Sequence, residues 1–143
     1  MSTKERAGTA AAFGASVVRA GQHVSAVRIL VCDDHDLIRV IVARVLRDEG
    51  HDVTETAAAA EALDALARTP HDAIVLDLHL RAESGLAVVD GLRDATPVIL
   101  ISGDFAAPSP EEAARFGVAA VLPKPFEPEQ LIDAVARVTA AAT

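Results

Sequence analysis

The chain has 143 residues, of which 51% are hydrophobic and only 3% aromatic, and its formal net charge at pH 7 is −8. This length fits one domain with a substantial core, and the negative charge disfavours direct nucleic-acid binding, because an acidic surface repels the phosphate backbone. The single cysteine, Cys32, excludes an internal disulfide, and no apolar run approaches the roughly 20 residues that span a bilayer, so we expect a cytoplasmic protein without membrane insertion.

Residues 1–26 are rich in Ala, Gly, Ser and Thr and precede the first strong strand signal. We interpret them as a flexible N-terminal tail, followed by a folded domain over residues 27–141. An alternative is that Thr9–Val18 belongs to a signal peptide, but Gly14 and Ser16 dilute its apolar run and no clear cleavage pattern follows. We therefore favour the tail.

From Arg28 onward, short apolar runs alternate with amphipathic stretches. This alternation is typical of βα units around a parallel sheet, and a core of aliphatic rather than aromatic residues suits that layered packing. The five runs that we predict as strands are Arg28–Cys32, Asp52–Thr56, Ala73–Leu76, Val98–Ser102 and Ala119–Leu122. The predicted fold is therefore α/β, with the βα unit repeated five times.

Helical patterns follow each of these strands. The apolar residues that recur at helical spacing in the first helix are Leu37, Ile38, Ile41, Val42, Val45 and Leu46. Gly50 is placed to end this helix, and Thr56 could cap the next one. The other predicted helices are Ala57–Ala67, Ala87–Leu92, Glu111–Phe116 and Glu129–Val138. Pro110 and Pro128 stand where helix starts tolerate proline.

Reactive residue types follow four of the predicted strands, at the carboxyl ends where a doubly wound sheet gathers its ligand groups. In chain order they are Asp33 and Asp34 after the first strand, Asp77 after the third, Ser102 at the end of the fourth and Lys124 after the fifth. Three converging carboxylates would repel one another by up to about 4 kcal/mol per pair at about 4 Å. They imply a hard divalent cation, and we expect Mg²⁺ because it suits few carboxylates together with a substrate phosphate.

This group of residues suits phosphoryl transfer. Lys124 can pair with a carboxylate at rest and with a phosphoryl oxygen after transfer, and the Ser102 hydroxyl can donate to another oxygen. Asp77 is the candidate nucleophile, because an acyl phosphate forms on a carboxylate without a base to remove a proton. The rival interpretation is that the acids merely cap a helix or end a strand and that Ser102 and Lys124 are ordinary loop residues. We favour the functional interpretation because all of these residues occur together.

Four segments stand in order along the chain: RILVCDDH, AIVLDLHLRAESGL, VILISG and LPKPF. Together they resemble the acidic pair, the phospho-acceptor strand, the hydroxyl-bearing strand and the lysine loop of the receiver domain of bacterial response regulators, including Gly85 eight residues after Asp77. The resemblance covers nearly all of residues 28–140. It implies a flavodoxin-like (CheY-like) five-stranded sheet of strand order 2-1-3-4-5, with residues 27–141 as the receiver domain.

The resemblance also implies a metal shell. By it, Asp34 should contact Mg²⁺ directly and Asp33 partly or through water, while Asp77 and the backbone carbonyl of His79 should complete the protein ligands. Asp77 should carry the phosphoryl group. This set of ligands is an implication of the resemblance and does not follow from spacing alone.

For the phosphoryl group, the resemblance assigns Ser102 and Lys124 to its oxygens and makes the Lys124–Pro125 bond cis. The donor would be a sensor histidine kinase or a histidine phosphotransfer protein. We expect no enzymatic activity beyond self-catalysed phosphotransfer and autodephosphorylation. Because few residues follow the last predicted helix, we expect a single-domain response regulator that signals to a downstream protein or relays its phosphate.

The sequence departs from the family pattern in three places. Val121 stands where Tyr or Phe is common, so the conformational signal should be smaller or travel through the fourth helix. Arg81 stands where proline is common, which should alter the loop and not the chemistry. His79 and Asp104 flank the mouth of the site by resemblance. Our hypothesis is that they pair across the phosphoryl group and set the lifetime of phospho-Asp77, so that alanine at either position should change the dephosphorylation rate.

Two other functions are a pseudo-receiver that serves only as a docking surface and a small phosphatase with an aspartyl-phosphate intermediate. The intact acid, hydroxyl and lysine set argues against the first, and the lack of a visible second acid/base Asp and substrate cap argues against the second. We expect Cys32 to be a core residue without a redox role. The histidines that we expect to face solvent are His23, His35, His51 and His71.

Overall fold

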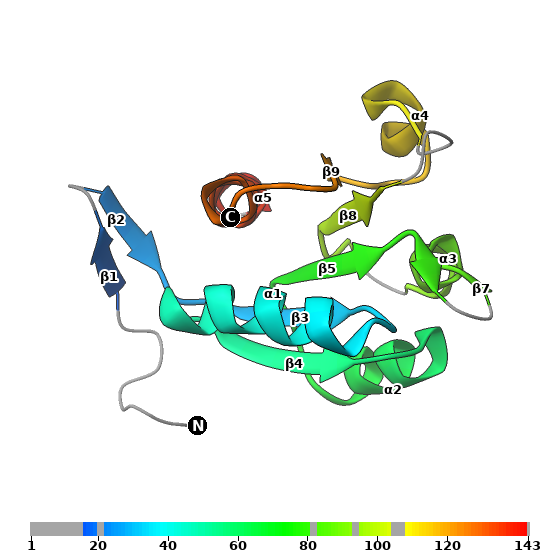
Figure 1. Cartoon of the computed structure of the whole chain (residues 1–143), viewed down its shortest axis with the longest axis horizontal. Helices are drawn as coiled ribbons and strands as arrows, with labels where there is room; N and C mark the ends of the chain where they lie inside the picture. Colours follow the sequence, from blue (N-terminus) through cyan, green and yellow to red (C-terminus); the bar gives the residue numbers. More distant parts are fainter. Residues whose placement is uncertain (1–15, 20–21, 81–82, 93–94, 104–107, 143) are drawn as a thin grey trace.

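The computed structural model describes residues 16–19, 22–80, 83–92, 95–103 and 108–142. A parallel five-stranded sheet forms its centre, with helices on both faces (Figure 1). The sheet contains β3 (Arg28–Cys32), β4 (Asp52–Thr56), β5 (Ala73–Asp77), β8 (Val98–Ser102) and β9 (Ala120–Pro123). The helices are α1 (Asp36–Asp48), α2 (Ala59–Arg68), α3 (Leu86–Gly91), α4 (Pro110–Arg115) and α5 (Pro128–Ala142).

The central sheet has the order β4-β3-β5-β8-β9, which is 2-1-3-4-5 when its strands are numbered along the chain. This order confirms the predicted doubly wound, flavodoxin-like α/β fold. The parallel register places Cys32 of β3 opposite Leu76 of β5, and Asp77 of β5 opposite Ile101 of β8. The residues that follow these strands therefore meet at one edge of the sheet.

The strand bounds were well predicted from sequence. β3, β4 and β8 have the predicted limits, β5 extends one residue further to Asp77, and β9 is shifted one residue toward the C-terminus. Every residue of β5 and of β8 is buried. Strands covered on both faces read as continuous apolar runs, which is why they stood out in the sequence.

Two apolar clusters fill the two faces of the sheet. α1 and α5 cover one face, where Leu46 and Leu131 belong to the same buried cluster as Val75 and Ile99. α2, α3 and α4 cover the other face, where Val88 belongs to the second cluster. Burial of each such Leu, Ile or Val side chain stabilises the fold by about 1.5 to 3 kcal/mol relative to leaving it exposed to water. Cys32 lies fully buried in the second cluster, and burial raises the pKa of its thiol to about 11. The expected core position of Cys32 is confirmed.

The helix ends agree with most of the sequence predictions. Gly50 has a φ of 90° just after α1, a conformation that glycine adopts at low cost, and Pro110 and Pro128 begin α4 and α5 as predicted. The prediction that Thr56 caps α2 is wrong. Its hydroxyl instead donates to the carbonyl of Val31 in the neighbouring strand, and α2 begins after Ala58 without a side-chain cap.

Two short antiparallel ladders were not predicted. β1 (Ser16–Arg19) pairs with β2 (Gln22–Ser25), and β6 (His79–Leu80) pairs with β7 (Glu83–Ser84). The first ladder lies in the region that was interpreted as a flexible tail, 1–26, and this regular structure was not expected there. Residues 1–15 of that region lie outside the described residues. Strands of two to four residues are too short to show a reliable period of two.

Two histidines expected to face solvent do not. His51 is buried, and its Nδ1 accepts a hydrogen bond from the backbone N–H of Val27 at 3.1 Å. His71 is partly buried between Thr54 and Thr69, with ring nitrogens 3.0 Å from Thr54 Oγ1 and 2.8 Å from the Thr69 carbonyl oxygen. Burial lowers the pKa of both imidazoles, that of His51 to about 4 despite the opposing charge of Asp72.

This buried imidazole predicts a pH dependence of stability. The folded-state pKa of His51, about 4, lies below its ordinary value of 6.5, so the neutral ring stabilises the fold above pH 6.5 and this contribution is lost as the pH falls toward 4. We expect the free energy of unfolding to drop by about 2 kcal/mol more in the parent than in His51→Asn between pH 7 and about pH 5. Denaturant unfolding at both pH values measures this difference, and equal drops would contradict it.

Candidate functional site

Three carboxylates meet at the carboxyl edge of the sheet. Asp33 and Asp34 follow β3, and Asp77 is the last residue of the neighbouring strand β5. The side chains of Asp33 and Asp77 are only 3% and 4% exposed. The parallel register of β3 and β5 brings these acids together although more than forty positions separate them in the sequence.

The turn that carries Asp33 is held by backbone and side-chain hydrogen bonds. The Asp33 N–H donates to the Thr56 carbonyl at 3.1 Å, its carbonyl accepts from the Arg39 guanidinium at 2.9 Å, and its Oδ1 accepts from the His35 N–H at 2.9 Å. Its Oδ2 is buried, and no hydrogen-bond donor among the described residues reaches it. Burial, followed by the charge of Asp77, raises the pKa of the Asp33 carboxyl, while the His35 N–H lowers it.

Asp77 is held from two sides. Its Oδ1 accepts a hydrogen bond from the backbone N–H of His79 at 3.0 Å, and its Oδ2 lies 3.4 Å from Lys124 Nζ. Both partners stabilise the negative charge of the carboxylate, and both contacts fix the orientation of the side chain. The sequence predicted the pairing with Lys124, which the structure shows.

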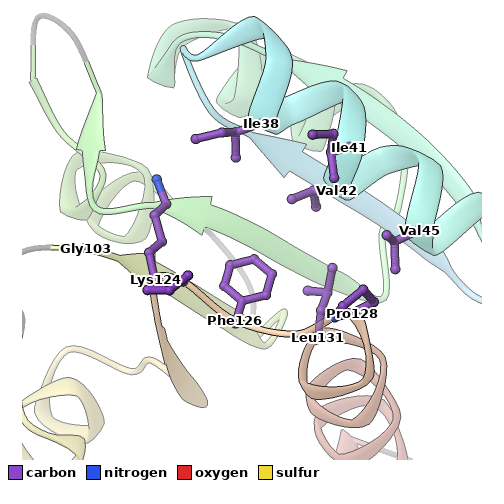
Figure 2. A pocket seen from close by; sticks show the side chains of 10 residues that line it. Ile38, Ile41, Val42, Val45, Gly103, Lys124, Phe126, Pro128 and Leu131 are labelled. Carbon is purple, nitrogen blue, oxygen red and sulfur yellow. The ribbon is translucent and has the colours of Figure 1, made fainter.

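Lys124 and Ser102 belong to the adjacent strand ends, as predicted. The Lys124 N–H donates to the Ser102 carbonyl at 2.8 Å, and the Ser102 side chain is buried. The Lys124–Pro125 peptide is cis, which agrees with the expectation from the family resemblance. Figure 2 shows the Lys124 side chain extending from its loop toward the strand end that carries Asp77.

Gly85 lies directly against the backbone of Asp77. A Cβ at this position would collide with the Asp77 carbonyl oxygen and would come within 3.1 Å of Leu78 Cα. The Gly85 N–H donates to the Leu78 carbonyl at 2.6 Å. Since Gly85 has an ordinary helical φ of −57°, close approach and not backbone conformation is what favours glycine here.

Of the two residues predicted to modulate the site, His79 lies among the described residues and Asp104 does not. The His79 side chain is exposed, while its backbone N–H is bonded to Asp77. Asp104 lies outside the described residues, as does Arg81. The pairing of His79 with Asp104 therefore stays a prediction.

The sequence interpretation missed His35. It was expected to face solvent, and its side chain is 62% exposed, but its Nδ1 lies 3.4 Å from Asp33 Oδ1, 3.3 Å from Asp34 Oδ1 and 3.9 Å from Asp77 Oδ2. Its place directly after the acidic pair was the available signal. A histidine there cannot be far from the carboxylates, because the turn itself folds back through the bond from the His35 N–H to Asp33.

Four side chains of this site offer possible metal-ligand atoms that all lie within 4.8 Å of one another: Asp33, Asp34, His35 and Asp77. The predicted carboxylate ligands are thus brought together, and the buried Asp33 Oδ2 presents a lone pair that no described donor uses. An isolated buried carboxylate is costly unless it is paired or binds a metal. The site therefore fits a divalent cation.

An apolar groove adjoins the site. It has a volume of about 610 Å³ and runs between α1 and the loop that leads into α5. Figure 2 shows Ile38, Ile41 and Val45 of α1 on one side, with Phe126 and Leu131 opposite and Lys124 at one end. Ile41 is 52% exposed although it belongs to the predicted apolar pattern of this helix.

The family model of the response regulator receiver domain matches residues 29–136. The chain belongs to this family. The match lies within the predicted receiver domain, 27–141, and contains every predicted site residue. Among the described residues, no helix is long and apolar enough to cross a membrane.

Similar proteins agree with this membership. The chain is 33% identical, over 132 residues, to the sensory/regulatory protein RpfC of Xanthomonas campestris, covering 87% of this chain and 18% of that protein. It resembles the crystal structure of NtrX from Brucella abortus with a TM-score of 0.76 and 33% identity, covering 82% of this chain and 28% of that one. For the chemotaxis protein CheY4 of Vibrio cholerae the TM-score is 0.71 and the identity 30%, covering 79% and 98%. The chain thus spans about a fifth of RpfC.

Proposed function

We propose that this receiver domain accepts a phosphoryl group on Asp77 in a Mg²⁺-dependent reaction. The observation that carries the proposal is the placement of Asp77, which lies beside the acidic pair and 3.4 Å from Lys124 Nζ at one edge of the sheet. A carboxylate oxygen of Asp77 attacks phosphorus, so that an O–P bond forms as the P–N bond of a phosphohistidine breaks. The departing imidazole keeps the electron pair and takes a proton from solvent.

The residues around Asp77 have distinct roles in this step. Asp33, Asp34, Asp77 and the His79 carbonyl would hold Mg²⁺, which supplies charge neutralisation at the transferring group. Lys124 leaves its contact with Asp77 Oδ2 and pairs with a phosphoryl oxygen, and the Ser102 hydroxyl donates to another. The family resemblance supports the assignments of His79 and Ser102.

Acetyl phosphate and Mg²⁺ test the proposal directly. We expect intact-mass measurement to show one phosphoryl adduct on the parent chain, none on Asp77→Asn, and none when a chelator removes Mg²⁺. Asp77→Asn keeps the shape of the side chain and removes the anionic nucleophile, so it is a matched control. No adduct on the parent, together with no binding of Mg²⁺, would instead support the pseudo-receiver.

Dephosphorylation is the second half of the proposed cycle. We propose that the site also hydrolyses its own acyl phosphate and has no other enzymatic activity. His79 is exposed beside Asp77, which supports its predicted influence on water access. The decay of the adduct in His79→Ala, compared with the parent, tests that influence, and equal rates would remove it.

We propose a sensor histidine kinase or a histidine phosphotransfer protein as the donor, with the groove beside α1 as its docking surface. The donor histidine must approach Asp77, and the groove adjoins Asp77 through Lys124 while exposing Ile41. A helix with an apolar face fits such a groove. The signal would then pass to a downstream protein or along a phosphorelay, and the single-domain organisation and cytoplasmic location stay predictions.

The docking surface can be tested by adding charge to it. We expect Ile41→Glu to slow phosphotransfer from an autophosphorylated histidine kinase by about tenfold or more, because the charge must be desolvated in the contact. The kinase is chosen from the source organism as the fastest donor to the parent chain. Phosphorylation by acetyl phosphate should stay unchanged. Val40→Glu is the matched control, since Val40 is equally exposed on α1 but does not line the groove.

A further inference from the structure

His35 sits at the mouth of the acidic site, above carboxylates that are much less exposed than the imidazole. The His35 side chain is 62% exposed, while those of Asp33, Asp34 and Asp77 are 3%, 12% and 4% exposed. The backbone of His35 is fixed by its own N–H bond to Asp33 Oδ1 at 2.9 Å. The imidazole is therefore the most exposed of the four side chains in this cluster.

The spacing of the four side chains suits one coordination shell. Ligand atoms at about 2.0 to 2.1 Å from one ion lie about 3 Å apart in octahedral geometry and about 3.3 Å apart in tetrahedral geometry. His35 Nδ1 lies 3.4 Å from Asp33 Oδ1 and 3.3 Å from Asp34 Oδ1, and 3.9 Å from Asp77 Oδ2. A single ion can therefore reach the imidazole nitrogen and the carboxylates with small movements of the side chains.

A second observation points to a cation independently of this spacing. Asp33 Oδ2 is buried on a side chain that is 3% exposed, and no donor among the described residues reaches it. Lys124 is directed to Asp77 Oδ2 instead. The Oδ2 atom of Asp33 thus lacks the partner that burial normally requires, although Oδ1 accepts from the His35 N–H.

We propose that His35 Nδ1 is a ligand of this site, and that the site therefore binds transition ions such as Co²⁺ and Zn²⁺ in preference to Mg²⁺. Imidazole suits zinc, copper, iron and nickel, whereas Mg²⁺ favours carboxylate, carbonyl and water oxygens. One nitrogen added to three carboxylates shifts the donor set toward the first group of ions. The inference rests on the proposed function for the metal site, and it adds a ligand and a metal preference that Mg²⁺ chemistry does not need.

Titration calorimetry of the full chain with Co²⁺ and with Mg²⁺ tests this preference. We expect the parent to bind Co²⁺ at least about tenfold more tightly than Mg²⁺, and His35→Ala to lose about tenfold in Co²⁺ affinity while its Mg²⁺ affinity stays within about twofold. His71→Ala removes an imidazole that contacts Thr54 and Thr69 instead of the acidic site, and it should retain the Co²⁺ affinity of the parent. Equal loss for both ions, or no loss in His35→Ala, would overturn the proposal.

Proton NMR of the Co²⁺-loaded chain provides a readout of the ligand itself. A strongly shifted, exchangeable imidazole N–H resonance is expected in the parent and in His71→Ala and should be absent in His35→Ala. The same resonance in His35→Ala would assign the ion to another histidine and overturn the proposal. Formation of the Asp77 adduct with acetyl phosphate and Mg²⁺ is measured separately, so that failure of the proposed phosphorylation and failure of the His35 ligand give different results.

Discussion

Lys124→Met is expected to slow transfer of the phosphoryl group from acetyl phosphate to Asp77 by about 100-fold, the effect of removing one placed donor from a site of developing charge. Lys124 Nζ lies 3.4 Å from Asp77 Oδ2, and the side chain is 23% exposed. Methionine keeps most of the length and apolar contact of the lysine and removes the charge together with the N–H donors. The initial rate of adduct formation, followed by intact mass, measures the loss.

The control for this substitution separates charge from packing. Lys124→Arg keeps the positive charge with a different donor geometry, so its rate should lie between those of the parent and of Lys124→Met. Thermal unfolding of all three proteins should show similar stability, because an ion pair at this position contributes little to folding compared with the core. A rate for Lys124→Met within about twofold of the parent would contradict a role for the ammonium group in the transfer.

The sequence was most informative where burial is complete. β5 and β8 are buried at every residue, and the continuous apolar runs that result gave their bounds to within one residue. The site followed from the same signal, because Asp77 and Ser102 stand at the ends of those runs and parallel strands bring their ends to one edge. Lys124 likewise follows a strand end, although β9 is only partly buried.

The contacts that sequence reasoning missed depend on tertiary neighbours. His51 follows the glycine after α1 and looks like a loop residue, yet it is buried and bonded to Val27, which precedes β3. His35 also looks like a loop residue, and only the folding of β5 beside β3 places Asp77 near its ring. The Thr56 hydroxyl could cap a helix or donate to a neighbouring strand, and it donates to the strand because the Val31 carbonyl is adjacent in the sheet.

Gly85→Ala is expected to lower the free energy of unfolding by about 2 to 3 kcal/mol, the usual range for overpacking a well-filled site. The added Cβ would collide with the backbone carbonyl of Asp77, with Asp77 C and Leu78 Cα each at 3.1 Å, so backbone must move and no flexible side chain can give way. The movement falls on the residue that carries the nucleophile. Denaturant unfolding should therefore show the loss of stability, and the rate of adduct formation should fall with it.

Gly103→Ala is the matched control for this substitution, since Gly103 lies at the same edge of the sheet beside Lys124. A Cβ there would meet Lys124 Cβ at 3.5 Å, an ordinary van der Waals contact, so the same added methyl group should cost less than about 1 kcal/mol. If both variants unfold like the parent, the approach of Gly85 to Asp77 is looser than the structure shows. If only Gly85→Ala is destabilised and phosphorylates slowly, the turn after β6 and β7 acts as a support that fixes the Asp77 carbonyl for the site.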